Sequence, residues 1–293
     1  MDLLPNYLTT HLPNSPVDRR DADVVGRHAR LELTFEYRAG RTVVTRAYAE
    51  PPLRIGRSFD LDGAAYVILV CAGPGVFSGD CLRQHVSVGR GARVLLASQA
   101  ALQVHPSPAP AAATVQHEYR VDEEGELLCQ WDPVIPFADA RLVQRVDVDL
   151  ATSSRFYWSD GLMSGRVSCG EAWRFESIDH ELRVAVCGAP GYLERYRLVP
   201  AERKPRRQWL AGPADYLGTT VVRHGGVTPR FVDELQTRFA DPSAAVDLVD
   251  ARLGLMVGRF LAASGTTWQR ERTTCRDVVL DSLFALPARS FRR

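Results

Sequence analysis

The chain has 293 residues, of which 45% are hydrophobic and 24% are charged, and its formal net charge is +1. These are the values of an ordinary soluble globular protein, and the near-neutral charge gives no support for nucleic-acid or acidic-membrane binding. The longest strongly apolar run, "YVILVCA", is far too short to span a bilayer.

The cysteines are scattered and show no paired spacing. Because no two of them form a C-x-x-C motif, neither a zinc ribbon nor a redox dithiol is indicated. The N-terminus has an acidic second residue and lacks the basic start and apolar core of a secretory signal. We therefore expect a cytoplasmic protein with six free thiols: Cys71, Cys81, Cys129, Cys169, Cys187 and Cys275.

The first part of the chain divides into a leader and a strand pair. Residues 1–27 are polar, contain proline and have no period, so they predict a loose N-terminal leader, with a single domain over residues 28–293. In "ARLELTFEY" (29–37) apolar and polar residues alternate strictly, which predicts a half-buried strand. The stretch "RTVVTRAYAE" (41–50) reads as its hairpin partner.

The same alternation recurs over more than a hundred residues, with Gly or Asp turns between the strands. Many short strands at near-regular spacing predict an all-β protein. We expect the strands to form a stacked or solenoid-like arrangement, although no exact internal repeat is visible. The alternating apolar sets are Leu82, Val86 and Val88; Val115, Tyr119 and Val121; Leu142, Val146, Val148 and Leu150; and Leu182, Val184 and Val186.

Two helices are expected near the C-terminus. In the first, Thr228 suits the N-cap and Pro229 the first helical position. In the second, Thr266 and Gln269 have the spacing of a capping box. Its apolar stripe is more typical of core packing than of a partner surface, although a helix near a chain end is a natural docking element. The stripe consists of Trp268, Cys275, Val279, Leu283 and Leu286.

The loop "AGPGVFSGD" (72–80) raises the question of a phosphate site. A phosphate loop needs a helix after it, but the following "CLRQHVSV" alternates like a strand. The glycine spacing is neither the Rossmann nor the Walker pattern, and the Asp80 carboxylate would repel phosphate. Glycine here allows positive φ or close backbone approach. The loop either holds Asp80 in a fixed place or is a plain connection with a solvated acid.

Four further segments follow one another along the chain: "SGD" (78–80), "LLASQAALQVH" (95–105), "QWDPVIPFADA" (130–140) and "DGLMSGRVSCGE" (160–171). In this order they resemble the UreD (UreH) family of urease accessory proteins. The resemblance is clear over residues 66–200 and faint at both ends. Among the departures, "GPG" replaces a paired glycine, Ser98 stands where Thr is common, and Gln103 and His105 replace Lys and Tyr. These differences bear on partner docking more than on the fold.

The resemblance implies a scaffold and not an enzyme. Proteins of this family join UreF and the GTPase UreG on apo-urease, and nickel is thought to pass through the UreD-like body. We therefore expect UreF-like and UreG-like partners, apo-urease as the target, and a dimeric assembly through UreF. Nickel would be bound transiently and weakly, with no nucleic-acid or membrane partner.

The candidate nickel residues carry oxygen or imidazole ligands. A divalent conduit needs several weak sites of this kind, because the ion must leave again. Asp80, Asp160 and Glu171 match acidic positions of the family motifs, Ser98 offers a neutral oxygen and His105 an imidazole. The structural alternative is an arginine–carboxylate network under tight turns, in which Arg166 balances Asp160 and Glu171.

Two other functions compete with the scaffold. In a carbohydrate-active enzyme on a β-scaffold, Asp160 and Glu171 would form the carboxylate pair. The aromatic residues of "RFYWSD" (155–160) would then stack on sugars. The third hypothesis is a binding module with no metal role.

Overall fold

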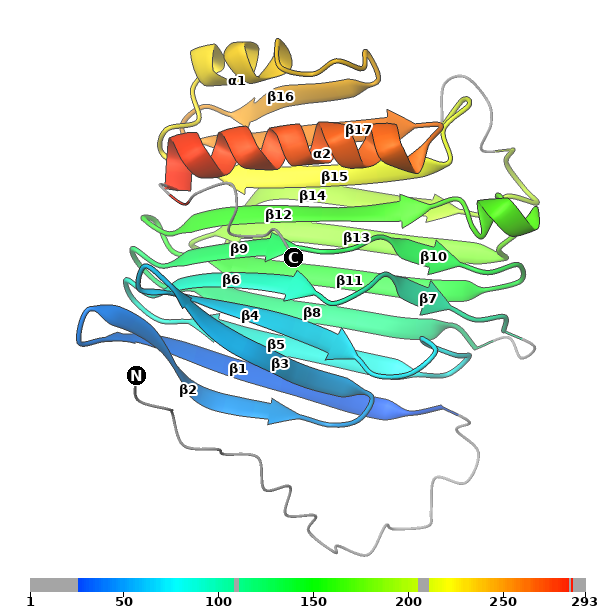
Figure 1. Ribbon diagram of the computed structural model, residues 1–293, viewed down its shortest axis with the longest axis horizontal. Helices are drawn as coiled ribbons and strands as arrows, with labels where there is room; N and C mark the ends of the chain where they lie inside the picture. The colour runs from blue at the N-terminus through cyan, green and yellow to red at the C-terminus, as the bar shows by residue number, and fades with distance from the viewer. Residues whose placement is uncertain (1–25, 108–110, 205–210, 285, 287–293) are drawn as a thin grey trace, which may run out of the picture.

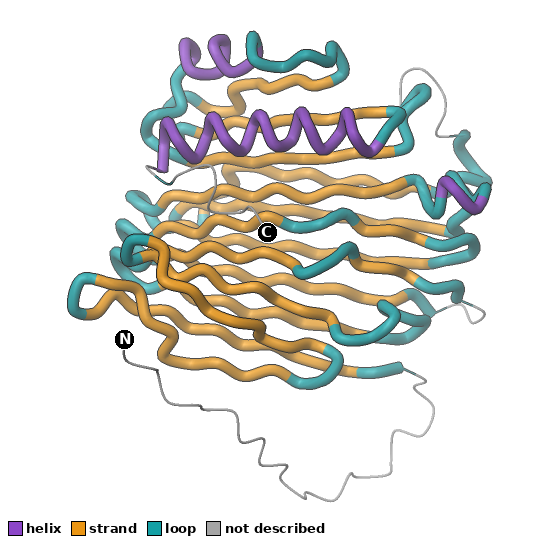
Figure 2. Tube along the Cα trace, viewed as in Figure 1, coloured by secondary structure: helices purple, strands orange, loops and turns teal. Residues whose placement is uncertain are grey.

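Two β-sheets stack face to face, and helices cover the outer face of one of them (Figure 1). The computed structural model describes residues 26–107, 111–204, 211–284 and 286. All but the last two residues of the predicted leader lie outside these ranges. Strands run across the molecule and the turns gather at its two ends (Figure 2).

Sheet A contains seven strands in the described part of the chain. From β1 to β13 its neighbouring strands are parallel, and antiparallel hairpin partners close both edges. The spatial order is β14 (Ala189–Leu198), β13 (Ser177–Val186), β11 (Arg141–Leu150), β8 (Ala113–Val121), β5 (Cys81–Val88), β1 (His28–Arg38) and β2 (Arg41–Ala49).

Sheet B contains ten described strands. Its central strands are parallel, and antiparallel strands extend it on both sides. The short strands β7 (Leu102–Val104) and β10 (Val134–Pro136) continue this layer beside β12. The main order is β16 (Ala244–Asp250), β17 (Leu255–Ala262), β15 (Tyr216–Arg223), β12 (Arg155–Met163), β9 (Glu126–Gln130), β6 (Arg93–Ser98), β4 (Ala64–Cys71) and β3 (Leu53–Leu61).

The chain passes from one sheet to the other and back, so each coil adds one strand to each sheet. Parallel neighbours need a crossover connection, and here the crossover is a strand of the opposite sheet. The register stacks Val86, Tyr119, Val148 and Val184 across four strands of sheet A. This confirms the expected all-β, solenoid-like arrangement.

The two sheets differ in how their faces are covered. Sheet A has one face on the core, and its strands alternate in burial as the sequence predicts. The central strands of sheet B are buried on both faces: Leu96 packs between the sheets while its neighbour Leu95 packs under the helices. Strands covered on both faces read as continuous apolar runs, which explains "YVILV" and "RVLLAS".

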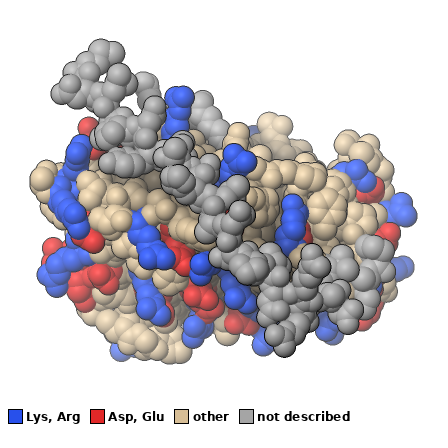
Figure 3. Space-filling view, turned by 90° about the horizontal axis from the view of Figure 1, so that it is seen from below, with Lys and Arg blue, Asp and Glu red and all other residues tan. Residues whose placement is uncertain are grey.

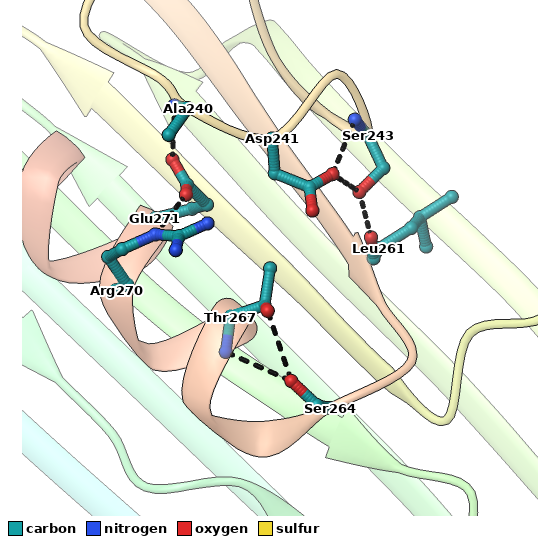
Figure 4. A network of polar contacts seen from close by, with 8 residues as sticks. All are labelled: Ala240, Asp241, Ser243, Leu261, Ser264, Thr267, Arg270 and Glu271. Atoms are coloured by element: carbon teal, nitrogen blue, oxygen red, sulfur yellow. Dashed lines mark hydrogen bonds and ion pairs between the residues drawn. The ribbon is translucent and has the colours of Figure 1, made fainter.

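Both predicted helices are present. Helix α1 (Pro229–Gln236) begins as expected, since the Thr228 hydroxyl accepts the Phe231 N–H at 3.2 Å. Helix α2 (Gly265–Val279) is capped by Ser264, which accepts the Thr267 N–H at 3.2 Å (Figure 4). The predicted capping box at Thr266 is wrong, because Ser264 already has the extended backbone of an N-cap.

The apolar stripe of α2 packs on sheet B, as expected. Trp268, Cys275 and Val279 are buried, and a π-helical turn, η2 (Leu280–Phe284), continues the helix. At the first turns, the buried Glu271 carboxylate accepts the Ala240 N–H at 3.1 Å (Figure 4). This contact ties the helix to the segment before β16.

Glycines in sheet B make room for the Trp268 ring. A Cβ atom on Gly161 would lie 2.2 Å from Trp268 Cζ2, and one on Gly218 would lie 2.8 Å from Trp268 Nε1. Distances below 3.0 Å do not occur for real Cβ atoms. The position of α2 on the sheet therefore depends on these two glycines.

Charges of both signs are mixed on the surface. Figure 3, which views the molecule from the β1–β2 side, shows lysine and arginine side chains beside aspartate and glutamate. On these two strands, Arg46 pairs with Glu32 and Arg38 with Glu36. In the described ranges, no helix combines the length and apolar character needed to cross a bilayer.

Candidate functional site

The glycine loop between β4 and β5 packs its backbone against β7. Gly75 has φ +127°, and a Cβ atom there would lie 2.2 Å from the Gln103 carbonyl oxygen. Val76 donates to that oxygen at 2.9 Å, and its own carbonyl accepts the His105 N–H at 2.9 Å. Close backbone approach is therefore why the loop needs glycine, and a strand follows it as predicted.

Asp80, at the end of this loop, is buried and fully hydrogen-bonded. Its carboxylate accepts the Arg27 backbone N–H at 2.8 Å and the Phe77 N–H at 3.0 Å, and pairs with the Arg27 guanidinium at 2.7 Å. Burial alone would raise its pKa, but the hydrogen bonds from Arg27 and Phe77 outweigh burial and lower it. Asp80 is thus an ionised acid held by fixed partners.

His105 lies in a stack of rings at the same end of the solenoid. Its imidazole stacks on Phe77 with centroids 4.3 Å apart and meets the edge of Phe137 at 4.7 Å. Its Nε2 donates to the Pro74 carbonyl oxygen at 2.8 Å. The guanidinium of Arg166 lies 3.9 Å above the Phe137 ring and extends this row.

Glu171 pairs with Arg166 at the end of the same row. The Arg166 Nε donates to the Glu171 carboxylate at 2.8 Å, Nη2 makes a second bond, and the Ala138 N–H donates at 3.2 Å. The hydrogen bond from Arg166 lowers the pKa of Glu171. Glu171 therefore forms the arginine–carboxylate pair of the structural alternative, whereas Asp160 does not take part in it.

Asp160 lies between the two sheets, where two cavities meet. In β12 the neighbours Ser159 and Gly161 face α2, so Asp160 points the other way, into the solenoid. The first cavity has a volume of about 130 Å³ and the second about 420 Å³. Both are lined by Asp160 and Gln144, so one carboxylate faces both spaces.

The environment of Asp160 favours its protonated form. Burial and the nearby Glu194 carboxylate raise its pKa, while His180 and Arg272 act in the opposite direction. This is the reverse of Asp80, whose hydrogen-bond donors stabilise the charge. An acid in such a cavity gains from a cation that enters it.

Ser98 lines the first cavity together with polar groups from other strands. Its Oγ donates to Asp132 Oδ2 at 3.1 Å and accepts the Asp132 N–H at 2.7 Å. His117 lies in the same lining and accepts a hydrogen bond from the Tyr119 hydroxyl at 2.8 Å or donates one to it. Burial, and to a smaller extent His180, lower the pKa of His117 to about 3, so it is neutral at pH 7.

The second cavity is bounded by an ion pair that the sequence analysis did not select. Glu194, which is 8% exposed, pairs with Arg259 at 2.6 Å. Tyr192 donates to the same carboxylate at 3.1 Å and Thr219 at 3.3 Å.

His117, in the first cavity, was also not selected, although the sequence contains a signal for it. It stands at an inward position between Val115 and Tyr119 in an alternating strand.

The predicted site residues therefore fall into two groups. Asp160 and Ser98 line the interior cavities, whereas Asp80, His105 and Glu171 line neither and lie at the glycine-loop end. Within residues 26–107, 111–204 and 211–284, no three His, Cys, Asp or Glu side chains come together in a group that could hold a metal ion.

The arrangement does not favour a sugar-binding site. Phe156, Tyr157 and Trp158 are completely buried, so their faces are not available to stack on a sugar. Asp160 faces the interior cavities and Glu171 is paired with Arg166. The two acids of the proposed catalytic pair belong to different surroundings.

Comparison with known proteins gives one consistent family. The family model described as UreD urease accessory protein matches residues 27–292. A urease accessory protein UreD from Sorangium cellulosum is 37% identical over 198 residues, which are 67% of this chain and 62% of that protein's length. Another from Deinococcus radiodurans is 31% identical over 269 residues, or 91% and 95% of the two chains.

A third relative, named urease accessory protein UreD, comes from Halalkalibacterium halodurans and is 34% identical over 179 residues, covering 60% of this chain and 66% of that protein. The family model spans the described solenoid from β1 to η2, including both interior cavities. The chain belongs to the UreD family of urease accessory proteins.

Proposed function

We propose that this protein is a non-catalytic scaffold that helps deliver nickel to apo-urease, and that nickel passes through the space between its two sheets. The observation that supports this most is the position of Asp160, which faces both interior cavities. The proposal assigns Asp160 and Ser98 to the path of the ion. Asp80, His105 and Glu171 remain candidates for the glycine-loop end.

The chemistry of the cavities suits an ion in transit. Single carboxylates, amides and hydroxyls bind a divalent ion weakly, and a conduit needs binding that is weak at each of several positions. Gln144 lines both cavities and Glu194 lines the second, so oxygen ligands continue beyond Asp160. A nickel ion would be cargo here, held transiently.

The expected partners are UreF-like and UreG-like accessory proteins and apo-urease, in the cytoplasm, with two copies assembled through UreF. Helix α2 buries Trp268, Cys275 and Val279 against sheet B, so only its outer face is free for a partner. Removing residues 267–293 would expose this core and would not isolate docking. A substitution on the exposed face, at Gln269, tests docking without that defect.

The test is co-expression of urease and its accessory proteins with Asp160→Asn in this chain. Because burial penalises the charged form of Asp160, the amide should not destabilise the fold. We expect the complex to be recovered in full. At limiting nickel, the nickel content of urease should fall by roughly tenfold, which corresponds to a loss of about 1.4 kcal/mol in the binding free energy of the ion.

The matched control is Asp122→Asn, which removes the charge of an exposed aspartate outside both cavities. It should leave nickel content and complex recovery at wild-type values. Full nickel loading with Asp160→Asn would contradict the interior path. Normal complex assembly with unchanged nickel would then favour a binding module without a metal role.

A further inference from the structure

A third cavity, of about 450 Å³, lies at the end of the solenoid opposite the glycine loop. Three turns line it: residues 152–155 before β12, residues 223–226 after β15, and residues 251–254 between β16 and β17. In Figure 1 this is the end where β12 begins and β15 finishes. It shares no lining residue with the two interior cavities.

All ionisable side chains that line this cavity are basic. They are Arg155, Arg223, His224 and Arg252, accompanied by the hydroxyls of Thr152, Ser153 and Ser154. The whole chain carries a net charge of only +1. Three arginines around one hollow are therefore a local excess of positive charge.

Arg223 is the most deeply buried of these groups, with 8% of its surface exposed. Its guanidinium donates to the carbonyl oxygens of Ser154 and Thr152, and its Nε has no hydrogen-bond partner. Among the described residues, no carboxylate lies within ion-pair distance of it. The carbonyl groups accept from its two Nη atoms but carry no net charge that could balance the guanidinium. Burial lowers its pKa, and the more distant Cys187 and Glu123 act in the opposite direction.

The other two arginines are also incompletely balanced, and His224 beside them is a neutral imidazole. Arg155 pairs with Glu126 at 2.8 Å, but the same carboxylate pairs with Arg93 at 2.8 Å, so one negative charge serves two guanidinium groups. Arg252 is exposed. His224 accepts the Gly226 N–H at its Nδ1, at 2.9 Å, which leaves Nε2 as the protonated nitrogen.

The nearest carboxylates are engaged by the turns themselves. Glu123 accepts the N–H groups of Thr152 and Ser153 at 3.1 and 2.8 Å. Asp250 accepts the N–H groups of Arg252 and Leu253 at 2.8 and 3.1 Å. Both acids shape the rim of the cavity, and neither forms part of its lining.

We propose that this cavity binds a polyvalent oxyanion of the phosphate class. Planar guanidinium groups are the donors that such anions select. Gly225 borders open space, since a Cβ atom there would meet nothing within 4 Å, and the volume leaves room for the remainder of a phosphorylated small molecule. This site is independent of the nickel path.

The test is calorimetric titration of the full-length protein with inorganic phosphate, at constant ionic strength in chloride buffer. We expect one saturable site per chain, with sulfate bound at the same place and acetate bound more weakly. The variant Arg252→Glu removes an exposed cation of the lining and adds an opposing charge. It should weaken phosphate binding by about tenfold or more.

The control is Arg238→Glu, which makes the same charge change at an exposed arginine outside the cavity. It should bind phosphate like the wild type. The proposal is overturned if phosphate gives no saturable heat, or if Arg238→Glu weakens binding as much as Arg252→Glu does. Acetate binding as tight as phosphate would overturn the assignment to a polyvalent anion.

Discussion

The Arg27 guanidinium lies 2.7 Å from the Asp80 carboxylate, and the backbone N–H of Arg27 donates to the same carboxylate at 2.8 Å. This pair joins the start of β1 to the start of β5. The two chain segments are in close contact, since a Cβ atom on Gly26 would lie 2.1 Å from the Gly79 carbonyl oxygen. Asp80 thus holds the start of β1 against the start of β5.

Replacing Asp80 with Asn should destabilise the fold. The change removes a buried charge that accepts four hydrogen bonds, and the half-exposed Arg27 can still reach water. We expect the free energy of unfolding to fall by about 1–3 kcal/mol in urea denaturation. The control Asp122→Asn, at an exposed site, should change it by less than about 0.5 kcal/mol.

The same variant has a defined pH dependence. Because the pKa of Asp80 is lowered on folding from its ordinary value of 3.8, the ionised form adds stability at neutral pH. That contribution is lost as the pH falls below 3.8 through the folded-state pKa. The stability curves of wild type and Asp80→Asn should therefore converge in acid, and a constant gap would argue against a charge effect.

Replacing Gly161 with Ala should displace helix α2. The added methyl group would meet the Trp268 ring at 2.2 Å, so the ring or the helix must move. We expect a loss of about 1–3 kcal/mol in the free energy of unfolding and a shift in tryptophan fluorescence. Gly225→Ala is the matched control, because nothing lies within 4 Å of its Cβ position. Equal effects of the two variants would show that Gly161 is not needed to make room for the Trp268 ring.

Protonation of His117 should account for part of the acid sensitivity of the protein. Its pKa is about 3 in the folded chain against 6.5 for the free group. Its contribution to stability is therefore complete above pH 6.5 and is lost as the pH falls towards 3, with a slope of up to about 1.4 kcal/mol per pH unit. Chemical denaturation of His117→Gln should show a shallower decline over this range. A curve parallel to the wild type would contradict it, and exposed His28→Gln serves as control.

Thiol labelling should separate the cysteines by burial. All six are free, as the sequence predicts, and Cys169 and Cys187 are exposed. Burial raises the pKa of Cys129 well above its usual value and that of Cys275 to about 12. Under native conditions Cys169 and Cys187 should react first, and Cys129 and Cys275 only after denaturation. Mass spectrometry of labelled peptides distinguishes them, and early labelling of Cys275 would show that α2 opens readily.

The strands of sheet A were predictable because only one of their faces is buried. The alternation of Val115, His117, Tyr119 and Val121 follows directly from a strand with one side in the core. Sheet B lacks this signal where helices cover its second face, and the sequence analysis accordingly did not identify strands such as β15 and β17. Alternation of apolar and polar residues marks a strand with one buried face. It disappears when both faces are buried, because both then carry apolar residues.

The candidate site was predicted only in part. Asp160 was selected from its motif, and it does lie inside the solenoid. Glu194 was missed because its partners Thr219 and Arg259 come from strands far along the chain. Asp80 and Glu171 were selected as well, but each forms an ion pair with an arginine, Asp80 with Arg27 and Glu171 with Arg166. A motif identifies a carboxylate, while its neighbours in space decide what that carboxylate does.

The sequence by itself determined the all-β class, both helices near the C-terminus and the strand after the glycine loop, because these depend on neighbours a few residues apart. Tertiary structure alone decided which polar groups share the space between the sheets. It also decided that Arg223 lies buried, with no carboxylate of the described residues within ion-pair distance of its guanidinium. The physical reason is that stacking brings together strands some 30 residues apart, as with Val86, Tyr119 and Val148. The electrostatic field at each ionisable group is the sum of the contributions of charged groups on those distant strands.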